Sequence, residues 1–223
     1  MGLSVGAQLG QIKVGLDRNK LADYQPYPKQ REFHAAGAVF RERLLIAGNQ
    51  TGKTYSASME SAMHLTGDYP EWWEGARFDA PIVEWTGSES NESSREIIQA
   101  SLLGTEDANE NSPNMGTGAI PGSAIVKLTK RQAGVRDVVD QIIVNYKGGG
   151  QSRAVLKTYE QKRLKWQGKR VDLVWVDEEP DPDIYSEALT RTNAVPDGKM
   201  LATFTGMKGT TAVYERFMSP RPE

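Results

Sequence analysis

Residues 44–54 read Leu-Leu-Ile-Ala-Gly-Asn-Gln-Thr-Gly-Lys-Thr. A short apolar run leads directly into a glycine-containing loop that closes on Lys-Thr, which is typical of a strand, a phosphate-binding loop and the start of a helix. In such a loop, backbone N–H groups and the positive end of the helix dipole converge on a phosphate. The stretch therefore predicts a P-loop that binds a nucleotide through Gly48, Asn49, Gln50, Thr51, Gly52, Lys53 and Thr54.

Two side chains of this loop have specific expected roles. Lys53 is predicted to reach the β- and γ-phosphates, and the Thr54 hydroxyl is predicted to be a ligand of Mg²⁺. The loop departs from the consensus at its first position, where Ala47 stands in place of glycine. An ordinary strand, turn and helix with a coincidental Gly-Lys-Thr is the alternative. The residues that follow, 55–65, have apolar side chains at helical spacing, so they predict the helix that a P-loop requires.

The composition limits the class of protein. The chain has 223 residues, of which 38% are hydrophobic, and 27 basic residues nearly balance 29 acidic ones. These values suit one α/β domain, with two small domains as the alternative, and any contact with a polyanion must be local. Cysteine is absent, and the two histidines, His34 and His64, are too few for a histidine cluster, so we expect them at the surface or packed against a helix. Apolar runs are too short for a membrane span, which predicts a soluble, intracellular protein.

A second motif lies near the carboxyl end of the chain. Residues 173–176 read Leu-Val-Trp-Val and precede Asp177-Glu178-Glu179-Pro180, which is the pattern of a Walker B strand. The strand is expected to bring the Asp177 carboxylate beside the P-loop to hold Mg²⁺. Glu178 is then placed to accept a proton from the water that attacks the γ-phosphate. The alternative is the charged first turn of a helix. Together with the P-loop, the motif predicts an ATPase that uses ATP and Mg²⁺.

A third segment precedes the P-loop and suggests a site for the base. Tyr27 lies between two prolines, where the backbone is extended, and a helix is predicted over residues 29–40. The Tyr27 ring could stack on adenine while the amide of Gln30 pairs with its edge. The alternative is a solvated helix start with Tyr27 packed in the core.

The rest of the chain alternates between strand and helix patterns. We predict strands over 81–86, 171–176 and 199–204, helices over 91–103 and 182–191, apolar segments over 125–128 and 138–146, a hairpin turn over 147–150 leading into 152–159, and a mobile excursion over 104–122. Such alternation favours a P-loop NTPase of the ASCE or RecA-like type, with a mostly parallel β-sheet flanked by helices. The adjacent Trp72 and Trp73 could stack on nucleic-acid bases, but we expect them to pin a long connection to the core.

The strand after Walker B ends in Thr203-Phe204-Thr205. Hydroxyl groups at this strand end are placed to sense the γ-phosphate and to couple its loss to a DNA-facing element. Threonine also suits any strand end, which is the alternative for Thr203 and Thr205.

Taken in order, these motifs resemble the N-terminal ATPase domain of tailed-phage terminase large subunits. The resemblance covers about residues 24–218 and rests on Tyr27 to Gln30, Ala47 to Thr54, Tyr159 to Gly168, Val174 to Pro180 and Thr203 to Thr205. It implies ATP-driven translocation of double-stranded DNA into a procapsid, in the cytoplasm of the infected host cell. A homo-oligomeric ring of large subunits would dock on the portal protein, and a terminase small subunit would aid DNA recognition.

The resemblance also implies a division of the chain. Residues 1–23 would be an N-terminal extension, 24–218 the ATPase domain and 219–223 a linker-like tail, and the C-terminal nuclease domain of the family is not expected in this chain. Many terminases carry an arginine in the P-loop where this sequence has Asn49. Charge on the γ-phosphate would then be balanced by another arginine, for which Arg153 and Arg163 are the candidates, acting within the chain or from a neighbouring subunit.

Three other functions share parts of this pattern. A helicase-like DNA translocase has the same site but needs a second RecA-like domain. A small-molecule kinase needs a lid with arginines, which the basic segment 162–170 could imitate, but it has less use for Glu178. A nucleotide-binding interaction module that does not turn over would more naturally lack a base at that position.

Overall fold

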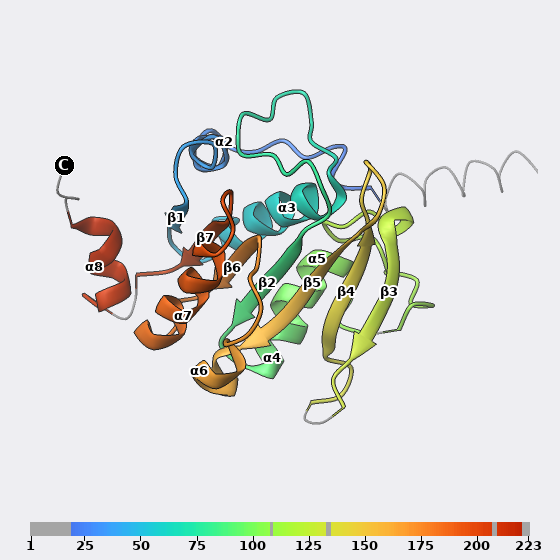
Figure 1. Ribbon diagram of the computed structural model, residues 1–223. Coiled ribbons are helices and arrows are strands. Elements are labelled where there is room, and N and C mark those ends of the chain that lie inside the picture. Colours follow the sequence, from blue (N-terminus) through green and yellow to red (C-terminus); the bar gives the residue numbers. More distant parts are fainter. Residues whose placement is uncertain (1–18, 108, 133–134, 207–208, 220–223) are drawn as a thin grey trace, which may run out of the picture.

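The sheet has seven strands in the order β1-β7-β6-β2-β5-β4-β3 (Figure 1). The structure, a computed structural model, describes residues 19–107, 109–132, 135–206 and 209–219. The strands are β1 (Glu42–Ile46), β2 (Val83–Ser88), β3 (Ile125–Lys130), β4 (Val139–Asn145), β5 (Gln151–Thr158), β6 (Leu173–Asp177) and β7 (Lys199–Phe204). Neighbouring strands from β1 to β5 along this order are parallel, whereas β4 pairs antiparallel with both β5 and β3. The predicted mostly parallel α/β fold is confirmed.

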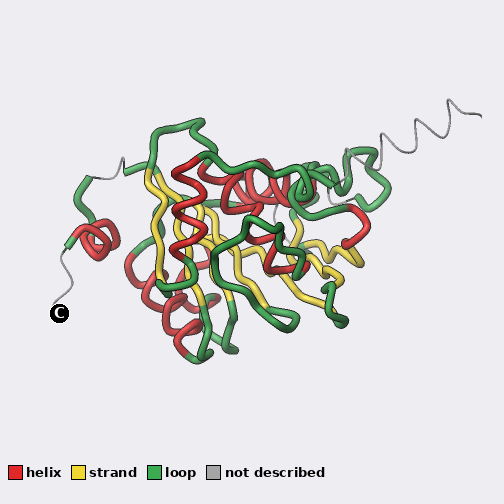
Figure 2. The backbone as a smooth tube through the Cα atoms, turned by 90° about the horizontal axis from the view of Figure 1, so that it is seen from above, coloured by secondary structure: helices red, strands yellow, loops and turns green. Residues whose placement is uncertain are grey.

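Helices cover both faces of this sheet (Figure 2). They are α2 (Pro28–Ala36), α3 (Lys53–Thr66), α4 (Asn91–Ser93) and α5 (Ala100–Leu103), the last two joined by a π-helical turn (Ser94–Gln99), then α6 (Lys162–Lys165), α7 (Pro182–Asn193) and α8 (Ala212–Met218). Short 3-10 turns lie at Gly122–Ala124 and Tyr159–Gln161. No helix in the described ranges is long and apolar enough to cross a membrane. Most of the predicted N-terminal extension and of the C-terminal tail lies outside the described residues.

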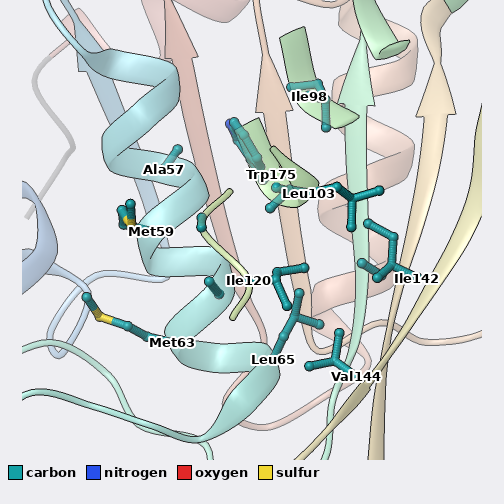
Figure 3. Packing of buried hydrophobic residues seen from close by; sticks show 14 of the residues in the cluster. Ala57, Met59, Met63, Leu65, Ile98, Leu103, Ile120, Ile142, Val144 and Trp175 are labelled. Carbon is teal, nitrogen blue, oxygen red and sulfur yellow. The ribbon is translucent and has the colours of Figure 1, made fainter. Parts of the chain in front are cut away.

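Helix α3 lies at the centre of the larger core (Figure 3). Its buried side chains, including Met59 and Met63, belong to the same cluster as Ile142 and Val144 of β4. Nearly the whole helix is buried, because the sheet covers one side and the connection over residues 67–81 covers the other. Trp73 of that connection is 4% exposed, so the predicted packing role of the tryptophan pair is confirmed. The helix that follows the P-loop is thereby fixed rigidly in the domain.

Several predicted boundaries differ from the structure by about two residues, as for β2, β6 and α7, and two predictions differ by more. The helix predicted over 29–40 ends at Ala36, and the N–H groups of Gly37, Ala38 and Val39 bond to carbonyl oxygens three residues back, which makes residues 37–39 turns. The predicted mobile excursion over 104–122 has little regular structure but buries Met115 and Ile120, so it is part of the core. The hairpin turn between β4 and β5 is confirmed.

Parallel strands bring their carboxyl ends to one edge of the sheet, and ligands of open α/β sheets bind outside that edge. Strands β1, β7 and β6 are neighbours, with Ile46 paired to Phe204 and Asp177 paired to Thr203. The P-loop, the Walker B carboxylates and the end of β7 therefore meet there.

Candidate nucleotide site

The P-loop follows β1 and has the backbone of a phosphate-binding loop. Gln50 (φ 58°) and Gly52 (φ 81°) both adopt left-handed conformations, which turn the chain sharply before α3. The Thr51 hydroxyl and the Lys53 ammonium each donate to the Gly48 carbonyl oxygen at 2.8 Å. The ammonium therefore lies over the loop, where the terminal phosphates of a nucleotide would be expected.

Asp177 ends β6 beside the first turn of α3. Its Oδ1 accepts hydrogen bonds from the Thr54 hydroxyl at 3.0 Å and from the Thr203 hydroxyl at 2.6 Å. Burial raises the pKa of Asp177 to about 6, although these two hydroxyls oppose the rise. The P-loop threonine and the Walker B aspartate lie together, as the sequence predicted.

Glu178 has an unusual backbone and an oriented side chain. Its φ is +61°, a left-handed conformation that costs about 1–3 kcal/mol for a residue with a side chain. The backbone N–H donates to the Thr203 carbonyl oxygen at 2.8 Å. The carboxylate Oε1 accepts from the Thr205 hydroxyl at 3.0 Å. The local structure therefore holds this carboxylate at the edge of the site.

Thr203 and Thr205 make different contacts. Thr203 is fully buried, and its hydroxyl oxygen also accepts from the Trp175 indole N–H at 2.9 Å. The Thr205 hydroxyl lies 3.3 Å from Asn49 Oδ1 and 3.0 Å from the Glu178 carboxylate, so it can donate to either. Thr205 thus bridges the P-loop and the Walker B segment.

Tyr159 completes the support of the Walker B segment. Its hydroxyl lies 2.9 Å from the carbonyl oxygens of both Asp177 and Glu178, and 3.3 Å from that of Gly87, so it can donate to one of them at a time. Burial, together with the nearby carboxylates, raises the pKa of Tyr159 well above its ordinary value, so the hydroxyl keeps its proton. Sequence reasoning gave this tyrosine no role of its own, although its place just after β5 puts it at the same sheet edge.

A cavity of about 370 Å³ lies beside the P-loop on the side of α2. Its lining includes three tyrosines and three glutamines, namely Tyr24, Tyr27, Tyr55, Gln25, Gln30 and Gln50. Tyr27 is 72% exposed, so it is not packed in the core and its ring is available for stacking. The cavity has the size and aromatic lining that a nucleotide base requires.

Gln30 is more constrained than the sequence suggested. Its Nε2 donates to the Gly52 carbonyl oxygen at 3.2 Å, and its Oε1 accepts from the Tyr27 N–H at 2.9 Å. Both ends of the amide are therefore used within the protein, and the side chain is buried. Gln30 ties the start of α2 to the P-loop, and only its remaining hydrogen-bonding capacity is left for a base.

Neither candidate arginine contacts this cluster in the described part of the chain. Arg153 pairs with Val83, five residues before Thr158 at the end of β5, which places it about 16 Å along the strand from the carboxyl edge. Arg163 in α6 forms an ion pair with Glu187, with 3.0 Å between Nε and Oε2. Within the described residues, neither arginine forms a hydrogen bond or ion pair with the P-loop or with Asp177.

The geometry has a counterpart among known protein families. Residues 44–219 match the family model described as terminase large subunit, T4likevirus-type, N-terminal. The chain belongs to this family. A curated relative, the terminase large subunit of Salmonella phage P22, is 37% identical over 215 residues. That alignment covers 89% of this chain but 42% of the relative, so the chain spans less than half of that protein.

Solved terminase structures have the same fold. The large terminase ATPase domain of Thermus phage P74-26 matches with a TM-score of 0.61 at 19% identity, over 91% of this chain and 73% of that one. The large terminase of another thermophilic bacteriophage, solved in complex with ADP, matches with a TM-score of 0.52 at 13% identity, over 80% of this chain and 39% of that one. The chain thus shares the fold of these terminase structures.

The donor set of this terminase domain fits Mg²⁺. That ion is usually held by one or two carboxylates, with phosphate oxygens and water completing its shell. The Asp177 carboxylate and the Thr54 hydroxyl are oxygen ligands of this kind. Among the described residues there is no cluster of three or more acidic or histidine side chains that would form a closed metal site. Burial raises the pKa of Asp177 more than Lys53 and the two hydroxyls lower it, so a bound cation would further stabilise the charged carboxylate.

Proposed function

We propose that the domain is the Mg²⁺-dependent ATPase motor of a terminase large subunit, which powers the translocation of double-stranded DNA into a procapsid. The observation that carries the proposal is the convergence on Asp177 of hydroxyls from Thr54 and Thr203, next to the oriented carboxylate of Glu178. Family membership and the ADP complex of the thermophilic phage relative support it.

ATP would bind with its phosphates at the P-loop and its base in the tyrosine-lined cavity. The backbone N–H groups of the P-loop and the Lys53 ammonium would bind the phosphates. Thr54 and Asp177 would hold Mg²⁺, which when bound neutralises charge on the phosphates. The tyrosine-lined cavity, with Tyr27 at its exposed side, would accept the adenine.

Glu178 is the proposed general base for hydrolysis. Its carboxylate would accept a proton from water as the water oxygen bonds to the γ-phosphorus and the bond to the bridging oxygen breaks. Thr205 orients this carboxylate through the 3.0 Å hydrogen bond, and Tyr159 stabilises the strained segment that carries it.

Coupling of hydrolysis to movement is proposed for Thr203 and Thr205, in different ways. Thr203 is buried and positions Asp177, whereas Thr205 contacts both the P-loop residue Asn49 and the base. A change at the γ-phosphate would therefore reach the end of β7 mainly through Thr205.

The partners follow from the family and are proposed with it. They are double-stranded DNA, the portal protein of the procapsid, a terminase small subunit and further large subunits in a ring. Arg153 lies along β5 away from the carboxyl edge, and Arg163 is paired with Glu187, so a catalytic role for either would need a rearrangement or a neighbouring subunit.

Turnover of ATP by a Lys53→Ala variant tests the proposal. We expect at least a tenfold loss of phosphate release with Mg²⁺, because the variant removes a positive charge from the phosphates, while the circular dichroism spectrum stays unchanged. Lys147→Ala, which removes an exposed lysine paired with Asp68, is the matched control. Wild-type turnover in the Lys53 variant would show that the P-loop assignment is wrong.

A further inference from the structure

The cavity beside the P-loop, called the base cavity below, has Tyr24 on its inner wall. The Tyr24 ring lines the cavity and meets the Tyr55 ring edge to face, with 5.7 Å between centroids and 77° between planes. Its hydroxyl lies 3.0 Å from His34 Nε2 and 3.4 Å from Ser56 Oγ. One part of Tyr24 therefore borders the cavity, and its polar group is bound in the interior.

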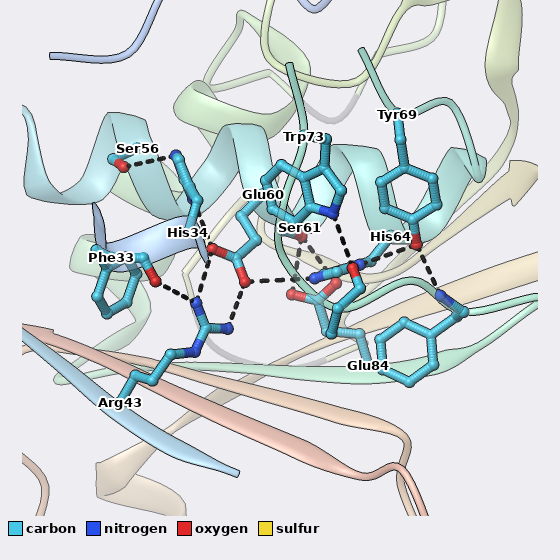
Figure 4. A network of polar contacts seen from close by, with 12 residues as sticks. Phe33, His34, Arg43, Ser56, Glu60, Ser61, His64, Tyr69, Trp73 and Glu84 are labelled. Atoms are coloured by element: carbon cyan, nitrogen blue, oxygen red, sulfur yellow. Dashed lines mark hydrogen bonds and ion pairs between the residues drawn. The ribbon is translucent and has the colours of Figure 1, made fainter. Parts of the chain in front are cut away.

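On its other side, the His34 ring contacts the buried carboxylate of Glu60 (Figure 4). Its Nδ1 lies 2.7 Å from Glu60 Oε2. The carboxylate accepts, so we place a proton on Nδ1, and with the proton there Nε2 is the ring nitrogen that can accept from the Tyr24 hydroxyl. Tyr24, His34 and Glu60 form a continuous hydrogen-bonded relay from the cavity wall to the middle of α3.

Glu60 is fixed by further contacts. The Arg43 guanidinium donates to both of its oxygens, and His64 Nε2 lies 3.3 Å from Oε1. Burial alone would raise the pKa of Glu60, but Arg43 and the two imidazoles hold it well below its ordinary value. Such a fully buried, paired carboxylate has one favourable arrangement, because separating it from its partners is costly.

The relay joins the elements that frame the cavity. Arg43 is in β1, which leads into the P-loop, His34 is in α2 and Glu60 is in α3. The position of the Tyr24 ring relative to the P-loop is thus set by hydrogen bonds and an ion pair as well as by packing. Trp72 and Trp73 contact His34, with ring centroids 6.2 and 5.2 Å away, and cover the relay from outside.

We propose that Tyr24 is a specificity-determining residue of the base cavity, and that His34 and Glu60 are positioning residues that hold its ring in place for adenine. This inference rests on the proposed function. Both ends of the Gln30 amide already form hydrogen bonds, with Gly52 and with Tyr27. The width of the base cavity must therefore contribute to selecting the base. Tyr24 forms its buried wall and Tyr27 its exposed one.

The variant Tyr24→Phe tests the role of the hydroxyl. It keeps the ring, and His34 Nε2 keeps the Ser56 hydroxyl at 3.2 Å as a partner, so the protein is expected to fold. We expect the Kd for ATP to rise by up to about tenfold, because the ring is no longer fixed in place and the free energy of one hydrogen bond limits the effect. The preference for ATP over GTP should fall by a similar factor, and the Kd for inorganic tripolyphosphate should not change. Calorimetry with the three ligands measures these values.

Tyr69→Phe is the matched control from the other end of the same network. The Tyr69 hydroxyl lies 3.0 Å from His64 Nδ1 and accepts from the Phe78 N–H at 3.0 Å, but Tyr69 does not line the cavity. It should lower stability without changing nucleotide preference. His34→Asn removes the relay at its centre and should reproduce the Tyr24→Phe shift in preference.

The outcomes separate two failures. Absence of ATP binding by the wild-type protein would overturn the proposed function. If the wild type binds ATP but Tyr24→Phe retains its Kd and its preference, the inference is wrong and the proposed function stands. Equal shifts in the Tyr24→Phe and Tyr69→Phe variants would also overturn the inference, because they would indicate a general loss of packing.

Discussion

Asp177 and Glu60 are both buried carboxylates. Asp177 contacts α3 and Glu60 belongs to it, yet the groups that donate hydrogen bonds to them carry different charges. Asp177 accepts hydrogen bonds from two hydroxyls, those of Thr54 and Thr203. Glu60 accepts from the Arg43 guanidinium and from two imidazoles. The pKa of Asp177 is raised to about 6, mainly by burial, whereas that of Glu60 is lowered despite burial.

This difference separates two uses of a buried acid. When a carboxylate has a cationic partner inside the protein, its negative charge is neutralised in the folded state without any ligand, so it serves the structure. When a buried carboxylate accepts hydrogen bonds only from neutral donors, a bound cation neutralises its charge and stabilises it further. The surroundings of Asp177 thus support its proposed role in holding Mg²⁺, and those of Glu60 support a structural ion pair.

The largest effect is expected for Glu178→Gln, next to Asp177 in the proposed nucleotide site. Glutamine keeps the shape but cannot act as the base, so hydrolysis should slow by roughly 10²- to 10⁴-fold while ATP binding and thermal stability are retained. Asp177→Asn should instead weaken the dependence of ATP binding on Mg²⁺. Phosphate release and calorimetric titration measure the two effects, and an exchange of phenotypes would reverse the assigned roles.

Glu60→Gln should have the opposite profile. It leaves Arg43 buried without its counter-charge, so the free energy of unfolding should fall by about 3–5 kcal/mol. At saturating ATP, the turnover of the folded fraction should stay near that of the wild type. Urea unfolding measures the loss, and an unchanged midpoint would remove the basis for calling Glu60 structural.

A smaller effect is expected at Glu84, a buried acid that shares the neutral donors of Asp177 but lies near the start of β2, away from the carboxyl edge of the sheet. It accepts only from the hydroxyls of Ser61 and Thr86, and burial raises its pKa to about 7. The folded state therefore binds its proton more tightly than the unfolded state, and the stability it contributes below about pH 4.5 is lost as the pH rises to about 7.

Glu84→Gln should consequently stabilise the protein, relative to wild type, by about 1–3 kcal/mol more at pH 8 than at pH 5. Urea unfolding at the two pH values measures this difference. The comparison with wild type at each pH cancels the titration of His64, whose pKa is lowered by burial and which affects stability in the opposite sense. A pH-independent difference would contradict the raised pKa.

The phosphate side of the site could be predicted from sequence because its parts are local. The P-loop and the Walker B segment are each contiguous, and the rule that parallel strands end at one edge places Thr54 beside Asp177. The relay could not be predicted, since Arg43, His34 and Glu60 come from three elements and form no motif. Both histidines pack at helices, which was one of the two expectations for them, but their contacts with Glu60 were not predicted.

The base side lies between these cases. The segment containing Tyr27 and Gln30 was predicted, and the structure places it at a cavity beside the P-loop. The use of both ends of the Gln30 amide by backbone groups depends on how α2 packs, which spacing does not determine. The contribution of Tyr24 depends on partners that are 10 and 32 residues away in the sequence.

The left-handed backbone at Glu178 sets stability against activity at a single position. Glycine would adopt a φ of +61° without steric cost, and asparagine adopts it more readily than most residues. A screen for heat resistance alone would therefore favour replacing the proposed base, and the most stable variants at this position would be inactive. Retention of glutamate in an evolving population would then report selection for turnover.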